Sequence, residues 1–71
     1  TTISFSLKQS GFTTLVVYDV LGREVATLVN NQMNVGSYNI VFNANDIPSG
    51  IYFYQIKSGD YVNTKKMMLL K

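Results

Sequence analysis

The sequence predicts an all-β fold, an antiparallel β-sandwich of about seven short strands. Apolar and polar residues alternate along most of the chain, as in the opening TTISFSL. Turn residues interrupt this alternation roughly every eight to twelve positions, and no helical stripe of useful length is present. This rhythm is typical of immunoglobulin-like and fibronectin-like domains.

Short turns or loops separate the segments that carry the strand pattern. In chain order these segments are residues 1–7, 13–19, 23–29, 38–43, 51–57 and 61–70. The Asn- and Gly-containing segment 30–37 is predicted to be a loop, because these residues tolerate positive φ. Another irregular segment ends at Gly50, since Pro48 cannot donate a ladder hydrogen bond. Tyr52 follows this corner, at the position of the tyrosine corner of immunoglobulin-like domains.

The composition excludes several classes of function. The 71 residues suffice for one small domain and contain neither cysteine nor histidine. No disulfide, thiolate nucleophile or Ser-His-Asp triad can form, and the commonest metal ligand is missing. The net charge of +2 is too small and too scattered for a nucleic-acid interface. No apolar run approaches the ~20 residues that span a bilayer. We therefore expect no catalytic residue, cofactor or metal site, no nucleic-acid partner and no membrane span.

The segment DVLG predicts a type I turn, with Asp19 at its first position and Gly22 at its fourth. Asp46 and Asp60 also fall in turns, where Asp side chains bind backbone, so catalysis by paired carboxylates is not expected. Arg23 follows the DVLG turn and has two possible roles. It either pairs with Asp19 or another carboxylate, or it offers its forked guanidinium for recognition.

Two further side-chain patterns concern the late strands. The aromatic run Tyr52-Phe53-Tyr54, with the other tyrosines, either fills the core or forms a platform on which sugars stack. Lys65 and Lys66 are adjacent on an expected strand, so their side chains point to opposite faces. There they protect a sheet edge from pairing with other chains.

Four stretches together resemble a known family: TTISFSL, YDVLGREVATLV, SGIYFYQI and GDYVNTKKMMLLK. In this order they resemble the type A carboxyl-terminal sorting domain of type IX secretion cargo, found in Bacteroidetes-type bacteria. The resemblance implies an immunoglobulin-like sandwich that acts as a non-enzymatic export signal. A cargo with an amino-terminal signal peptide would enter the periplasm, and this domain would direct it through an outer-membrane translocon. A surface sortase would then remove the domain, commonly joining the cargo to an anionic lipopolysaccharide.

The resemblance also implies partners and site residues. The partners are translocon and shuttle proteins, the surface sortase and an upstream cargo domain in the same chain, in a secreted or cell-surface protein of a Gram-negative bacterium. The family's motifs fall on Tyr18, Asp19, Gly22, Arg23, Gly50, Tyr52, Lys65, Lys66, Met67, Met68, Leu69, Leu70 and Lys71. Residues 1–71 are expected to be a single sorting domain, a fragment of a larger precursor. The family's Asn- and Pro-rich lead-in is missing, and the cleavage junction is expected upstream of Thr1.

The ending, Met67 to Leu70, is apolar on both faces of the expected final strand. One face is expected to contact the core, and the other suits docking to a receptor by strand addition or groove insertion. Alternatively, both faces are covered within the domain or by self-association. Two other functions stay open, a passive immunoglobulin-like stalk and a carbohydrate-binding module. Aromatic side chains aligned in solvent would favour sugar binding, whereas buried aromatics with an exposed ending favour sorting.

Overall fold

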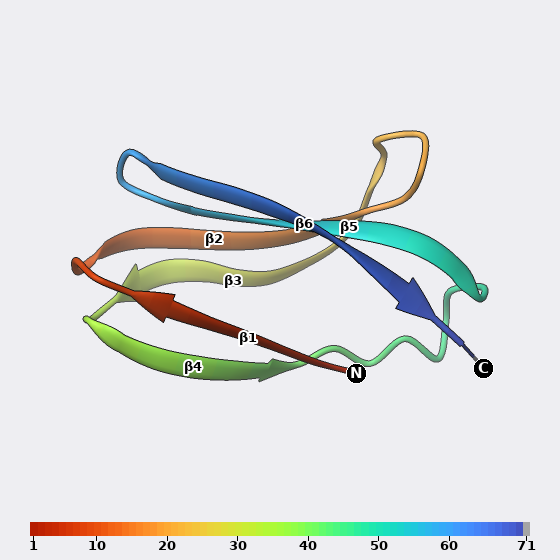
Figure 1. Cartoon of the computed structure of the whole chain (residues 1–71), viewed down its shortest axis with the longest axis horizontal. Helices are drawn as coiled ribbons and strands as arrows, with labels where there is room; N and C mark the ends of the chain where they lie inside the picture. Colours follow the sequence, from red (N-terminus) through yellow and green to blue (C-terminus); the bar gives the residue numbers. More distant parts are fainter. Residues whose placement is uncertain (71) are drawn as a thin grey trace.

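The computed structural model describes residues 1–70, which form β-strands and no helix (Figure 1). The strands are β1 Thr2–Leu7, β2 Gly11–Tyr18, β3 Glu24–Met33, β4 Gly36–Val41, β5 Gly50–Ser58 and β6 Tyr61–Leu69. The all-β prediction is confirmed, with six strands rather than about seven. No helix long and apolar enough to cross a membrane is found among the described residues.

The strands form two antiparallel sheets that pack against each other. β1 pairs with β4 in a two-stranded sheet, and the order β3-β2-β5-β6 makes a four-stranded sheet. Figure 1 shows β1 and β4 in one layer and β2, β5 and β6 in the other. This arrangement confirms the predicted sandwich.

Side chains from both sheets meet in one hydrophobic core. Its buried apolar members are Ile3, Leu7, Leu15, Val17, Val29, Phe42, Tyr52, Ile56 and Leu69. In β1 the serines between the buried Ile3 and Leu7 are exposed, and in β2 the side chains of Leu15 and Val17 are 0% exposed. Full burial of such an aliphatic side chain stabilises the fold by roughly 1.5–3 kcal/mol. In β1 and β2 the alternation in the sequence therefore matches the alternation of buried and exposed side chains.

The prediction of a loop at residues 30–37 is wrong. β3 continues through residues 30–33, which pair with residues 11–14 of β2. Only residues 34–35 then separate β3 from β4. Asn and Gln have a weak tendency to form strands, but pairing with a neighbouring strand overrides that tendency.

The tyrosine corner is confirmed. The Tyr52 side chain is 6% exposed, and its hydroxyl donates a 2.7 Å hydrogen bond to the carbonyl oxygen of Pro48. This bond ties the irregular segment after β4 to the start of β5. It therefore holds the corner in place while the ring of Tyr52 fills the core.

Replacing Tyr52 by Phe should test this bond. We expect Tyr52→Phe to lower the free energy of unfolding by about 1 kcal/mol, because a partly buried carbonyl loses its donor. The matched control is Tyr38→Phe, since the Tyr38 hydroxyl donates to the carbonyl oxygen of Asn34 at 2.6 Å in an exposed place where water can replace it. Urea unfolding measures both variants, and equal losses would contradict a special role for the corner.

Candidate recognition site

The three motif segments, residues 18–23, 50–52 and 65–70, meet at one end of the four-stranded sheet. β2 runs antiparallel to β5, and β5 runs antiparallel to β6. The end of β2, the start of β5 and the end of β6 therefore lie together, on the right in Figure 1. This proximity brings the candidate site residues into one region of the molecule.

The register of the β2–β5 and β5–β6 pairs determines which motif side chains are neighbours. Tyr18 pairs with Phe53, and Phe53 pairs with Lys66, so these three side chains form a row across three strands. The row lies on the outer face, because Val17 of the same strand is fully buried on the inner face. Beside the row, Ile51 pairs with Met68, and their side chains are 38% and 62% exposed. The outer face thus combines an aromatic, an apolar and a basic part.

The turn between β2 and β3 is the predicted DVLG turn. The Gly22 amide donates to the Asp19 carbonyl oxygen at 3.0 Å, and the Asp19 amide donates to the Arg23 carbonyl oxygen at 2.9 Å. Gly22 has φ +82°, in the left-handed region that favours glycine. A turn closed in this way, with a left-handed residue at its end, is a common three-residue hairpin loop.

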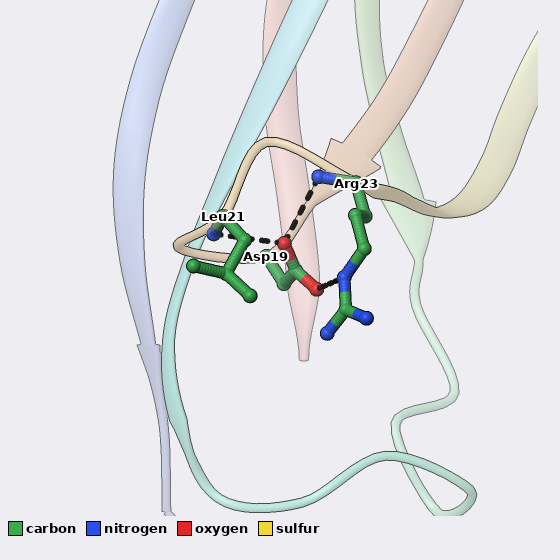
Figure 2. Close-up of polar contacts among 3 residues, drawn as sticks. All are labelled: Asp19, Leu21 and Arg23. Carbon is green, nitrogen blue, oxygen red and sulfur yellow. Dashed lines mark hydrogen bonds and ion pairs between the residues drawn. The ribbon is translucent and has the colours of Figure 1, made fainter.

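The Asp19 carboxylate organises this turn from inside (Figure 2). Its Oδ1 accepts hydrogen bonds from the backbone amides of Leu21 and Arg23, both at 2.9 Å. Its Oδ2 accepts from Nε of Arg23 at 2.9 Å. Of the two kinds of carboxylate partner considered for Arg23, the structure shows that it pairs with Asp19 of the same turn.

The pairing with Asp19 leaves much of Arg23 accessible. The Arg23 side chain is 73% exposed, whereas that of Asp19 is 16% exposed. Figure 2 shows a dashed line to the carboxylate only from Nε, and none from the two terminal guanidinium nitrogens. The carboxylate thus orients the guanidinium while its forked end faces solvent.

The same contacts lower the pKa of Asp19 below its ordinary value of 3.8. The main cause is the hydrogen bond from the Arg23 backbone amide, and the Arg23 side chain and the Leu21 amide act in the same direction. Each of these groups stabilises the ionised carboxylate. The turn is therefore most stable when Asp19 is charged.

The terminal strand has one inward and one outward apolar face, as predicted. Leu69 is 3% exposed and Met67 is partly buried against the core. Met68 and Leu70, by contrast, are 62% and 83% exposed. The predicted site residue Lys71 lies outside the described residues.

Lys65 and Lys66 point to opposite faces of β6, as the sequence predicts. Both are exposed, and they pair with Tyr54 and Phe53 respectively. Lys65 is on the core side of the sheet, because Tyr54 pairs with the buried Val17. Lys66 belongs to the outer face.

The sequence did not indicate a hollow at the same end. It has a volume of about 460 Å³ and lies between the segment after β4 and the end of β6. Its lining residues are Thr1, Val41, Phe42, Asn43, Ala44, Asn45, Leu69 and Leu70. No local sequence pattern indicates this hollow, because its lining comes from segments that are brought together only when the two sheets pack.

Two alternative site chemistries find little support in the geometry. Among residues 1–70, no group of three or more acidic, His or Cys side chains could hold a metal ion. Among the aromatic side chains that the structure describes, most are buried or half-buried, and only Phe12 and Tyr61 are 50% exposed or more. Register places these two on opposite faces of the four-stranded sheet, because Tyr61 pairs with Ser58 and Ser58 with Thr13, the neighbour of Phe12. They do not form an aligned platform.

Acid should weaken the domain through Asp19. Its pKa is lowered in the folded state, so its contribution to stability is present above pH 3.8 and is lost as the pH falls through the lower folded-state pKa. We expect the free energy of unfolding to fall less between pH 7 and about pH 3 in Asp19→Asn than in the wild type. Urea unfolding at both pH values is the measurement, and Asp46→Asn is the charge-matched control. An equal pH dependence in wild type and Asp19→Asn would contradict this role.

Gly50 should tolerate no side chain. Its φ of +152° lies in a region that L-residues rarely adopt, although no atom lies within 4 Å of an added Cβ. Gly50→Ala should therefore destabilise the fold by about 1–3 kcal/mol through backbone strain alone. Gly11→Ala is the control, because its Cβ would lie an ordinary 3.7 Å from Oγ of Ser58 without a positive φ. Similar thermal unfolding of the two variants would remove the strained corner from this account.

Comparison with known proteins identifies the family. The chain matches the family model described as the secretion system C-terminal sorting domain over residues 1–70. No curated protein and no solved structure matches it. The match covers every residue that the structure describes. The chain therefore belongs to the family of type IX secretion system C-terminal sorting domains.

Proposed function

We propose that this domain directs a secreted cargo protein through the type IX outer-membrane translocon and has no enzymatic activity of its own. Family membership supports a sorting signal of a secreted or cell-surface protein, and implies contact with the secretion machinery. In this proposal residues 1–71 are the carboxyl-terminal domain of a longer precursor in a Gram-negative bacterium. A surface sortase removes the domain, and the cargo is attached to the cell surface.

The observation that carries this proposal is the meeting of the motif segments at one end of the sheet. Residues 18–23, 50–52 and 65–70 are far apart in the sequence but adjacent in the fold. A receptor that binds this end could contact all three segments at once. A passive stalk has no need for such an arrangement.

Within the motifs, we assign three kinds of role. Asp19, Gly22, Gly50 and Tyr52 shape the turn and the corner through hydrogen bonds and backbone conformation. Arg23, Lys65, Lys66, Met68 and Leu70 are exposed and form the surface that a receptor contacts. The third role is to anchor this surface. Tyr18 pairs with β5, and Met67 and Leu69 pack against or in the core. Lys71 extends the same basic ending.

The immunoglobulin-like topology is part of the proposal. Two observations support it: the tyrosine corner at Tyr52 and the division of the strands between two antiparallel sheets. A stable sandwich of this kind would present the recognition end of the domain as a rigid surface. Recognition would then depend on folded geometry as well as on the motif residues.

Of the two alternative functions, the carbohydrate-binding module is the less favoured. Sugar-binding surfaces on β-sandwiches use aligned, exposed aromatic rings, and Phe12 and Tyr61 point to opposite faces. The exposed Met68 and Leu70 instead favour a protein partner. The passive stalk is distinguished by an export assay.

The assay is surface display of a fluorescent reporter that carries a signal peptide and residues 1–71, in a host with the type IX system. We expect the intact fusion to reach the surface and the double variant Met68→Ser/Leu70→Ser to be retained in the periplasm. Arg23→Ala should lower the surface signal several-fold. These variants change exposed side chains, so thermal unfolding of the purified domain should confirm that the fold persists.

The matched control is Lys8→Ala, an exposed basic residue just after β1, at the opposite end of the sandwich. It should be exported like the wild type. Retention of the intact fusion, even with a family-like lead-in restored before Thr1, would overturn the sorting function in favour of the stalk. Equal export of all variants would remove the recognition role of this end.

A further inference from the structure

β6 is the longest regular open edge in the described structure. It pairs with β5 on one side only, over nine residues without a register shift. The opposite edge of the same sheet, β3, carries two register shifts against β2. The strands of the small sheet are shorter, with six residues each. Unpaired backbone groups along β6 can therefore accept another strand.

The charged side chains on β5 and β6 all have one sign. Lys65 and Lys66 lie in the middle of β6, and Lys57 lies on β5. Neither strand contains a carboxylate, and Asp60 lies in the turn between them. The Asp19 carboxylate is already engaged by Arg23. The β6 edge thus presents positive charge, and neither strand of the β5–β6 hairpin supplies a carboxylate to balance it.

This charge disfavours pairing of β6 with a second copy of itself. Antiparallel pairing about the midpoint of the strand places Lys65 opposite Lys65 of the copy. A shift of one residue places Lys65 opposite Lys66 of the copy. Like charges directly opposite each other destabilise a strand pair. The edge is therefore protected against self-association but not against an acidic strand.

We propose that β6 binds an extended acidic segment of a different protein by strand addition. Carboxylates on both faces of the added strand lie beside Lys65 and Lys66, which point to opposite faces. Apolar side chains farther along the added strand cover Met68, which is 62% exposed. This inference rests on the proposed function, in which the terminal strand docks to the export machinery, and it adds the chemistry of the partner.

The test uses a peptide of residues 61–70 that carries Lys65→Glu and Lys66→Glu. This probe has the strand pattern of β6 with the charges reversed. Binding to the isotope-labelled 71-residue chain is followed by chemical-shift changes in NMR spectra. We expect changes along β6, and binding that weakens as salt is added.

Charge exchange provides the matched controls. The unsubstituted peptide should bind the wild-type chain about tenfold more weakly, since two favourable charge pairs are replaced by repulsion. The chain with Lys65→Glu and Lys66→Glu should reverse the preference and bind the unsubstituted peptide better. A merely structural role of the lysines would not produce this reversal. A scrambled peptide with the same composition as the acidic probe controls for non-specific attraction.

Several outcomes would overturn the inference. These are absence of binding, equal binding of both peptides, equal binding of the scrambled peptide, shifts confined to β1 or β4, or dimerisation of the wild-type chain through β6. The export assay separates this failure from failure of the proposed function. If Met68→Ser/Leu70→Ser blocks export but the acidic peptide does not bind, sorting stands and strand addition by an acidic segment is wrong. If the peptide binds and reverses its preference but export does not need β6, the surface exists and its role in sorting is wrong.

Discussion

The pairing of β2 with β5 in the middle of the large sheet is the interaction on which the rest of the molecule depends. Leu15 and Val17 anchor it, because both side chains are fully removed from solvent between the sheets. Its register sets Tyr18 beside Phe53, and so brings the end of β2 to the start of β5. β6 then adds to β5 in antiparallel register, which places the terminal strand at the same end. Proximity of the motifs is a consequence of this central pair.

The motif residues therefore divide by what they contact. Asp19 is largely enclosed by the amides of its own turn, and Tyr52 is buried with its hydroxyl on Pro48. Neither can offer much surface to a partner. Arg23 and Met68 are exposed, but their positions are set by the turn and by the strand pair. A short sequence motif can thus combine residues that hold the backbone in shape with residues whose side chains lie on the surface.

The terminal strand illustrates how a small domain can leave apolar surface exposed. Its inner face contributes Leu69 to the core, so the strand is held even though it lies at a sheet edge. Its outer face leaves Met68 in solvent, where an uncharged edge would invite aggregation. Lys65 and Lys66 stand next to this apolar part and place charge on both faces. In the proposed binding mode, these lysines oppose self-association and leave the edge open to a partner of opposite charge.

The sequence by itself determined the features that depend on one strand or one turn. Alternation identified the buried face of β1 and indicated that the ending has one inward and one outward apolar face, because a strand with one face in a core must alternate. Asp19 and Gly22 indicated their turn, and Tyr52 its corner, through local hydrogen-bonding geometry. Tertiary structure alone decided the strand neighbours, the extension of β3 through residues 30–33 and the meeting of the motifs at one end. These depend on which strands pair across the chain, and a pattern of period two reports burial without naming the partner.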